Sequence, residues 1–234
     1  DLYQELQNDK NRSLGFIQNG SLNISECSDR MEEIKRSTSM GRNFGLDISI
    51  LEKDEIKERY PLLNIDGVAG GVFLPKDGQI NPVDVTMALA QEAKLHGAQI
   101  FEQTKAIDFI EEEGSVKTVV TDKGEIHCKK IVIAAGMWSR EVGKLCGINI
   151  PLHACEHFYV LTEPSKNIPK NLPILRVADS YIYVKEDAGK LLIGAFEPKA
   201  KPWGMEGIPE EFEFDSLPED YDHFEPILLK AMNR

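Results

Sequence analysis

The pattern of apolar and polar positions predicts a hairpin and two helices in the first part of the chain. Apolar residues from Leu14 to Ile24 flank Asn19-Gly20, and this dipeptide favours the positive φ of a tight hairpin turn. Two charged segments, from Asp29 to Ser39 and from Ile50 to Tyr60, show weak helical spacing and favour helices. A proline directly follows the second segment, and we expect it to end that helix.

The most strongly predicted element is a helix from about Pro82 to His96. Asn81 has a side chain that caps helix N-termini, and proline suits the first helical position. Gly97 can end the helix in the left-handed conformation. Together these signals predict an amphipathic helix. Its apolar stripe comprises Val85, Ala88 and Leu89.

Short apolar runs separated by glycines predict strands in the middle of the chain. A continuous run from Ile131 to Ala135 ends at Gly136, which is typical of a strand buried on both faces of a parallel sheet that turns into a helix. Ligands bind at the carboxyl ends of such strands. Further strands are expected at 70–75 and 98–101, and a small antiparallel meander at 106–111, 116–121 and 125–128.

Longer alternating runs in the last third predict an antiparallel sheet. Its expected strands are His157 to Thr162, Tyr181 to Lys185 and Leu191 to Phe196, and a final helix is expected from Tyr221 to Asn233. The fold class is therefore mixed α/β (α+β). We expect part of a doubly wound sheet with a small antiparallel meander, interleaved with a layer made of an antiparallel sheet.

Composition narrows the classes of partner. Among 234 residues, 27 basic side chains stand against 39 acidic ones, a net charge of −12, which argues against nucleic acid or an anionic membrane as the principal partner. No apolar run approaches the ~20 residues that span a bilayer. The cysteines show no CxxC pair or zinc-ligand spacing, so neither a disulfide framework nor a metal site is indicated. They are Cys27, Cys128, Cys146 and Cys155.

Four segments carry a family likeness. They are Asp77–Pro82 (DGQINP), Gly97–Ala98, Ala134–Gly143 (AAGMWSREVG) and His157–Val160 (HFYV). Together they resemble the D-amino-acid-oxidase-like flavoproteins, and within that group the dimethylglycine and sarcosine dehydrogenases and the regulatory subunit of pyruvate dehydrogenase phosphatase. The likeness extends from about Leu14 to Glu197.

The resemblance implies an enzyme that uses FAD to oxidise the C–N bond of an N-methylated amino acid by hydride transfer to the flavin. Carried over by position, the backbone at Ala134, Ala135 and Gly136 lines the flavin, and the main chain of Ala106 meets the adenine. Trp138 follows at the turn. The cofactor supplies the organic chemistry, so the protein has to bind and orient the substrate and exclude competing reactions.

On the substrate side, the resemblance places His157 near the substrate, where an imidazole tunes protonation close to neutral pH. Tyr181 and Tyr183 are two residues apart and are expected on one strand face, where a phenol caps the substrate or orients its carboxylate. Arg176 or Lys185 could offset that carboxylate. The alternative is that the histidine is a satisfied core residue and that the tyrosines serve only packing.

The departures from the family pattern predict an internal fragment. The sequence has no GxGxxG motif, so no helix N-terminus is marked for the pyrophosphate. The flavin-linking histidine segment of the family is also missing. The expected division is a mainly substrate-side or connecting segment at 1–75, part of the FAD-binding domain at 76–150, and a mainly substrate-binding antiparallel sheet at 151–234.

The resemblance implies a small N-methyl amino acid as substrate, an electron-transfer partner, and tetrahydrofolate through a domain that longer relatives carry. It implies the bacterial cytoplasm or the mitochondrial matrix as location. Two alternatives stay open. One is a non-catalytic regulatory homologue, and the other is a flavin oxidase of another amine or amino acid.

Overall fold

The computed structural model describes residues 2–8 and 13–234. The chain forms two compact units, each built from separate stretches of sequence. The first unit comprises Asp1–His96, His157–Lys199 and Glu219–Arg234, and the second comprises Gly97–Glu156 and Ala200–Pro218. The predicted mixed α/β class is confirmed, with several sheets and helices in one chain.

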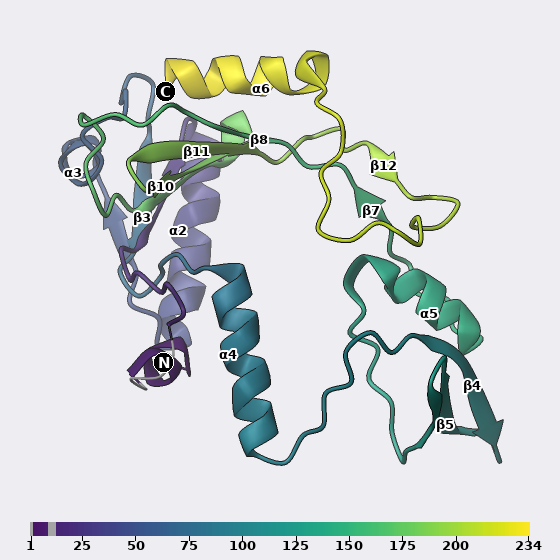
Figure 1. Ribbon diagram of the computed structural model, residues 1–234. Helices are drawn as coiled ribbons and strands as arrows, with labels where there is room; N and C mark the ends of the chain where they lie inside the picture. The colour runs from purple at the N-terminus through teal and green to yellow at the C-terminus, as the bar shows by residue number, and fades with distance from the viewer. Residues whose placement is uncertain (1, 9–12) are drawn as a thin grey trace. The chain divides into compact units, whose positions relative to one another are not determined.

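The first unit is built on a seven-stranded sheet (Figure 1). Its strands are β1 (Ser21–Ser25), β2 (Ser49–Leu51), β3 (Gly70–Leu74), β8 (Tyr159–Leu161), β9 (Ile174–Val177), β10 (Ile182–Asp187) and β11 (Lys190–Ala195). Their order in the sheet is β2-β3-β1-β9-β10-β11-β8. Neighbouring strands are antiparallel except β1 and β9, which are parallel. The predicted strands of the last third, which correspond to β8, β10 and β11, pair antiparallel as expected, and the sheet as a whole is mixed because β1 and β9 are parallel.

Several helices of this unit begin at residues whose side chains cap the N-terminus. They are α1 (Leu2–Asn8), α2 (Ser28–Asn43), α3 (Lys53–Arg59), α4 (Pro82–Leu95), α6 (Tyr221–Asn233) and the 3₁₀ turn η2 (Ala178–Ser180). Asn81 accepts hydrogen bonds from the backbone N–H groups of Val83 and Asp84 at the start of α4, as its cap position predicts. Glu52 and Glu55 form a reciprocal capping box at α3.

One face of the sheet forms the main core. Leu22 pairs with Leu175 across β1 and β9, and Val177 pairs with Ile182 across β9 and β10. All four side chains are at most 2 % exposed. Helix α6 runs along β10 and β11 in Figure 1 and contributes buried Phe224 and Ile227 to the same cluster. Burial on this face fixes the register, because a shift by one residue would expose every core side chain.

The opposite face of the sheet carries polar and aromatic residues in one row. The register pairs Asn23 with Arg176, Arg176 with Tyr183, Tyr183 with Gly194, and Gly194 with Tyr159. Directly paired residues point to the same side of a sheet. The row is therefore a continuous surface across β1, β9, β10, β11 and β8, and it lies on the side away from the main core.

Tyr60 is a buried residue whose hydroxyl forms no hydrogen bond within the described part of the chain. Its side chain is 3 % exposed, its hydroxyl has no hydrogen-bond partner among the described residues, and burial raises its pKa. Because a buried unpaired hydroxyl costs free energy, Tyr60→Phe is expected to leave the free energy of unfolding unchanged or to raise it by up to ~1 kcal/mol. Thermal and urea unfolding would measure this, and a clear loss of stability would reveal a partner for the hydroxyl.

The second unit contains the predicted meander, which is confirmed. Its elements are β4 (Ala106–Glu112), β5 (Ser115–Thr121), β6 (Gly124–His127), η1 (Gly136–Trp138), α5 (Ser139–Leu145), β7 (Ala154–Cys155) and β12 (Pro202–Trp203). β4, β5 and β6 form a three-stranded antiparallel sheet, and β7 pairs with β12. Arg140 of α5 donates hydrogen bonds to the backbone carbonyls of Gly204 and Met205. These bonds connect α5 to Ala200–Pro218, the second stretch of sequence in this unit.

The predicted hairpin at Asn19-Gly20 is wrong. Gly20 has the expected positive φ of +79°, but β1 pairs with β3 on one side and β9 on the other. Both edges of β1 are thus taken by strands distant in sequence, whose apolar residues join the core. The second predicted helix also begins later than expected, because Ile50 lies in β2 and α3 starts at Lys53.

Two predicted strands, at 98–101 and at Ile131–Ala135, are wrong as well. Both segments are irregular, and Val132 is 86 % exposed. A strand is stable only when neighbours satisfy its backbone groups, and none of the described strands pairs with either segment. An apolar run alone therefore does not form a strand here.

Candidate active site

An aromatic cluster lies at the end of the polar row. His157 precedes β8, Tyr183 lies in β10 and Phe196 directly follows β11. The ring centroids of His157 and Tyr183 are 6.0 Å apart in a stacked arrangement, and those of Tyr183 and Phe196 are 5.2 Å apart. His157 and Phe196 are 5.7 Å apart. The structure thus brings two of the predicted catalytic residues, His157 and Tyr183, into one site.

Gly194 creates the space for the Tyr183 ring. These residues are directly paired across β10 and β11. A Cβ atom added to Gly194 would lie 2.1 Å from Cζ of Tyr183 and 2.3 Å from its hydroxyl oxygen. The phenol therefore lies flat over the backbone of β11, which is the close approach that a glycine within a strand permits.

Glu197 holds the imidazole of His157. Its side chain is only 3 % exposed, whereas that of His157 is 45 % exposed. One carboxylate oxygen lies 3.1 Å from Nδ1 of His157, and the other accepts a hydrogen bond from the backbone N–H of Phe158. Burial, together with the nearby charges of Glu197 and Tyr159, raises the pKa of Tyr183, so its phenol stays protonated at neutral pH.

Arg176 supplies the positive charge of the site. Its guanidinium carbon lies 4.9 Å from the centroid of the Phe196 ring, and it makes no ion pair with any carboxylate in the described part of the chain. Lys185, the other predicted carboxylate partner, is instead 3.7 Å from Asp187. In a chain with 39 acidic residues, an unpaired arginine beside aromatic rings favours an anionic ligand.

The prediction that Tyr181 and Tyr183 share one strand face is wrong. Tyr181 ends η2 in the left-handed conformation, with φ of 63° and ψ of 30°, and β10 begins only at Ile182. The alternation of a strand does not extend through a left-handed residue. The Tyr181 ring instead lies 5.0 Å from Nζ of Lys230 on α6, so the structure does not bring it to the aromatic cluster.

The predicted cofactor residues all belong to the second unit. Ala106 is the first residue of β4, and Ala134, Ala135, Gly136 and Trp138 lie at the turn into η1 and α5. Gly136 is exposed with φ of +55°, and a Cβ added there meets no described atom within 4 Å. Gly136 therefore leaves the backbone at this turn unobstructed among the described residues, which is compatible with the close approach of a cofactor. The sequence contains no GxGxxG motif for the pyrophosphate.

Sequence reasoning missed Gly194, Phe196 and Glu197. The sequence signal for Gly194 is a glycine inside the predicted strand Leu191 to Phe196, since such a glycine marks a close approach of the backbone. Phe196 and Glu197 directly follow β11, and only the fold shows that they meet His157.

Comparison with known proteins identifies the family. The model of the FAD dependent oxidoreductase family (DAO) matches residues 1–234. The chain is 36 % identical over 236 residues to the mitochondrial pyruvate dehydrogenase phosphatase regulatory subunit of Mus musculus, covering 100 % of this chain and 27 % of that protein. It is 34 % identical to 4-methylaminobutanoate oxidase (formaldehyde-forming) of Paenarthrobacter nicotinovorans, and the match covers 99 % of this chain and 28 % of that protein. It is 32 % identical to mitochondrial sarcosine dehydrogenase of Mus musculus, covering 99 % and 25 %.

The chain thus spans about a quarter of the length of these curated relatives. Among solved structures, L-proline dehydrogenase from P. horikoshii has a TM-score of 0.82 at 24 % identity, covering 99 % of this chain and 59 % of that one. This likeness shows the fold. No described helix is long and apolar enough to cross a membrane. The chain belongs to the DAO family of FAD-dependent oxidoreductases, and it is related to the sarcosine and dimethylglycine dehydrogenases.

Proposed function

We propose that the protein oxidises the C–N bond of an N-methylated amino acid, such as sarcosine or dimethylglycine. The observation that carries this proposal is an unpaired arginine, Arg176, beside the aromatic rings of His157, Tyr183 and Phe196. A guanidinium recognises a carboxylate, and aromatic rings accept methyl groups and an amine. Relatives whose names include sarcosine and 4-methylaminobutanoate support this substrate class.

Each side chain has a distinct task in this proposal. Arg176 binds the substrate carboxylate and so fixes one end of a small molecule. The rings of Tyr183 and Phe196 pack against the N-methyl carbon, which limits the orientations of the amine. Because the Tyr183 phenol stays protonated, it offers a hydrogen-bond donor and not a negative charge.

His157 removes the proton from the substrate ammonium, since only an amine with a free lone pair can be oxidised to an iminium. If Nδ1 donates to Glu197, Nε2 carries the lone pair that accepts this proton. Glu197 then stabilises the imidazolium that forms, as a buried carboxylate beside a histidine does. Glu197 acts as a positioning residue and His157 as the base.

The backbone at Ala106 and at Ala134, Ala135 and Gly136 would hold the cofactor, with Trp138 at the following turn. When bound, FAD supplies the acceptor for the hydride that leaves the carbon beside nitrogen. The proposal includes an electron-transfer partner that accepts these electrons from the full-length protein.

The test is the absorbance of the full-length protein between about 350 and 500 nm, before and after anaerobic addition of sarcosine or dimethylglycine. We expect bound flavin that bleaches. Trimethylglycine is the matched control, because it keeps the carboxylate and methyl groups but has no lone pair on nitrogen, and it should leave the flavin oxidised. Bound flavin that no N-methyl amino acid bleaches would contradict the proposed substrate class.

A second candidate function is regulation without turnover. The observation that favours it is the 36 % identity to the pyruvate dehydrogenase phosphatase regulatory subunit. In that case the same row of residues binds a small carboxylate as a signal. Full-length protein that binds sarcosine but contains no flavin would support this function over catalysis.

A further inference from the structure

A pocket lies under α6 in the first unit, and it shares Glu197 with the candidate active site. It has a volume of about 220 Å³, which is enough for a small organic molecule. The aromatic rings of His157, Tyr183 and Phe196 do not line it. Its lining consists of Tyr181, Glu197, Pro198, Lys199, His223, Pro226, Ile227 and Lys230.

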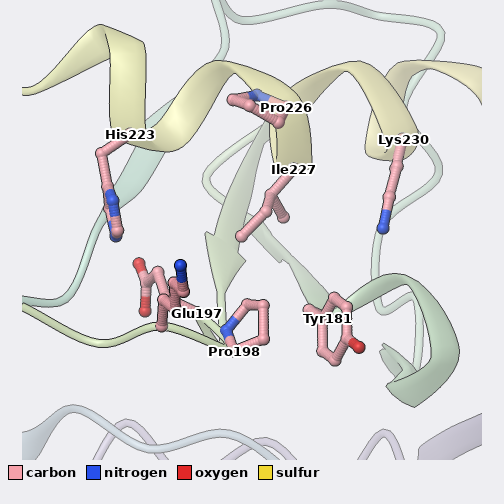
Figure 2. A pocket seen from close by; sticks show the side chains of 8 residues that line it. Tyr181, Glu197, Pro198, His223, Pro226, Ile227 and Lys230 are labelled. Atoms are coloured by element: carbon pink, nitrogen blue, oxygen red, sulfur yellow. The ribbon is translucent and has the colours of Figure 1, made fainter.

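The roof of the pocket has polar ends and an apolar middle. His223, Ile227 and Lys230 are spaced along one side of α6, and Figure 2 shows all three side chains hanging from the helix in the same direction. His223 and Lys230 are seven residues apart, which is ~10 Å along a helix at 1.5 Å per residue. Ile227 lies between them, facing Pro198 on the opposite wall.

The polar group at one end is an unsatisfied imidazole. Nε2 of His223 is buried and has no hydrogen-bond partner among the described residues. The His223 ring contacts Phe158, with centroids 5.5 Å apart, so packing holds it in place. A buried nitrogen without a partner costs free energy, and Figure 2 shows this side chain reaching down to the level of Glu197. A hydrogen-bonding group of a ligand would satisfy it.

The polar group at the other end is an ammonium. Nζ of Lys230 lies over the ring of Tyr181 at 5.0 Å, and the described residues place no carboxylate in an ion pair with it. The one acidic residue of the lining, Glu197, is bound by His157 and the backbone of Phe158. With Lys199 also in the lining, the pocket has two ammonium groups against one carboxylate.

The backbone conformation of Tyr181 determines where its ring lies. Tyr181 has a φ of 63°, which is uncommon for a bulky residue. The conformation is held by a hydrogen bond from the N–H of Phe196 to the Tyr181 carbonyl, 2.8 Å long. It places the phenol at the pocket, beneath Lys230 (Figure 2).

We propose that this pocket binds a short-chain carboxylic acid that carries a hydrogen-bonding group at its far end. The carboxylate contacts Lys230, the methylene groups lie between Ile227 and Pro198, and the terminal group reaches Nε2 of His223. A neutral terminal group is preferred over a second carboxylate, because Glu197 lines the same pocket. The inference does not depend on the proposed catalytic function.

The test uses 4-hydroxybutyrate as the probe, with binding to the full-length protein followed by saturation-transfer NMR and equilibrium dialysis. Butyrate lacks the terminal group and butane-1,4-diol lacks the carboxylate, so both should bind about tenfold more weakly or worse. Succinate should also bind more weakly. Equal binding of the diol and the probe would overturn the recognition of an anion, and absence of saturable binding would overturn the site.

Two variants assign the contacts. Lys230→Met keeps the length of the side chain and should weaken 4-hydroxybutyrate about tenfold. His223→Phe keeps a ring against Phe158 and should reduce the affinity for 4-hydroxybutyrate to that for butyrate. Lys170→Met removes one charge from an exposed position outside the pocket and should leave the affinity for 4-hydroxybutyrate unchanged. Unchanged affinity in Lys230→Met and His223→Phe would place the probe elsewhere on the protein.

Discussion

Replacing Gly194 by alanine is expected to lower the rate of substrate-dependent flavin reduction in the full-length protein by about 100-fold. The new methyl carbon would lie 2.1 Å from Cζ of Tyr183, which is far too close for two carbon atoms that are not bonded to each other. The ring has to move by more than 1 Å, and a displacement of that size at a reacting site costs ~10² in rate. The ring would also leave its stacking position on His157.

The structural cost of this change is expected to be smaller. Tyr183 is half-buried, so its ring can swing outward, and the free energy of unfolding should fall by ~1–3 kcal/mol, the usual range for overpacking. The double variant Gly194→Ala with Tyr183→Ala is the control. Once the ring is gone, the alanine has space, and adding Gly194→Ala should have little further effect. A full second loss in the double variant would show that Gly194 acts through the backbone and not through Tyr183.

The elements that the sequence predicted well are those with local signals. Helix α4 begins at its Asn81 cap and ends before Gly97, and the meander has glycine turns between short strands. The elements that were predicted wrongly depend on pairing with segments that are distant in the sequence. The run Ile131–Ala135 has strand composition, but strands form only in a ladder, and β1 pairs with distant strands although Asn19-Gly20 favours a local turn.

The candidate site was predictable only in part, because several of its contacts join residues that are distant in the sequence. The family resemblance places His157 near the substrate and leaves Tyr181 and Tyr183 as alternatives, and the structure stacks His157 on Tyr183. Glu197 could not be found, because its role depends on burial and on two contacts made across the sheet. Tyr181 was placed on the wrong face because strand alternation was assumed to continue through it, whereas its positive φ turns the chain before β10 begins.

Replacing Arg176 by methionine is expected to weaken the binding of sarcosine by about 10- to 100-fold, since a charge-assisted hydrogen bond to a carboxylate contributes ~1.5–3 kcal/mol. Arg176 is exposed on β9 and methionine is also an unbranched side chain, so folding should be little affected although the guanidinium contact with Phe196 is lost. The effect should appear in the substrate concentration that gives half-maximal flavin reduction, more than in the limiting rate, because the carboxylate is bound equally in the ground state and the transition state.

Two comparisons make this prediction specific. Arg36→Met removes one positive charge from an exposed position on α2 and should leave sarcosine binding unchanged, which controls for net charge. N-methylpropylamine lacks a carboxylate, so any slow reduction that it causes should be equal in the wild-type protein and in Arg176→Met. An equal loss with both compounds would mean that Arg176 supports the aromatic cluster through Phe196 and does not bind the carboxylate. The carboxylate would then have to bind elsewhere, and Lys185, on the same face of β10 as Tyr183, would be the next residue to replace.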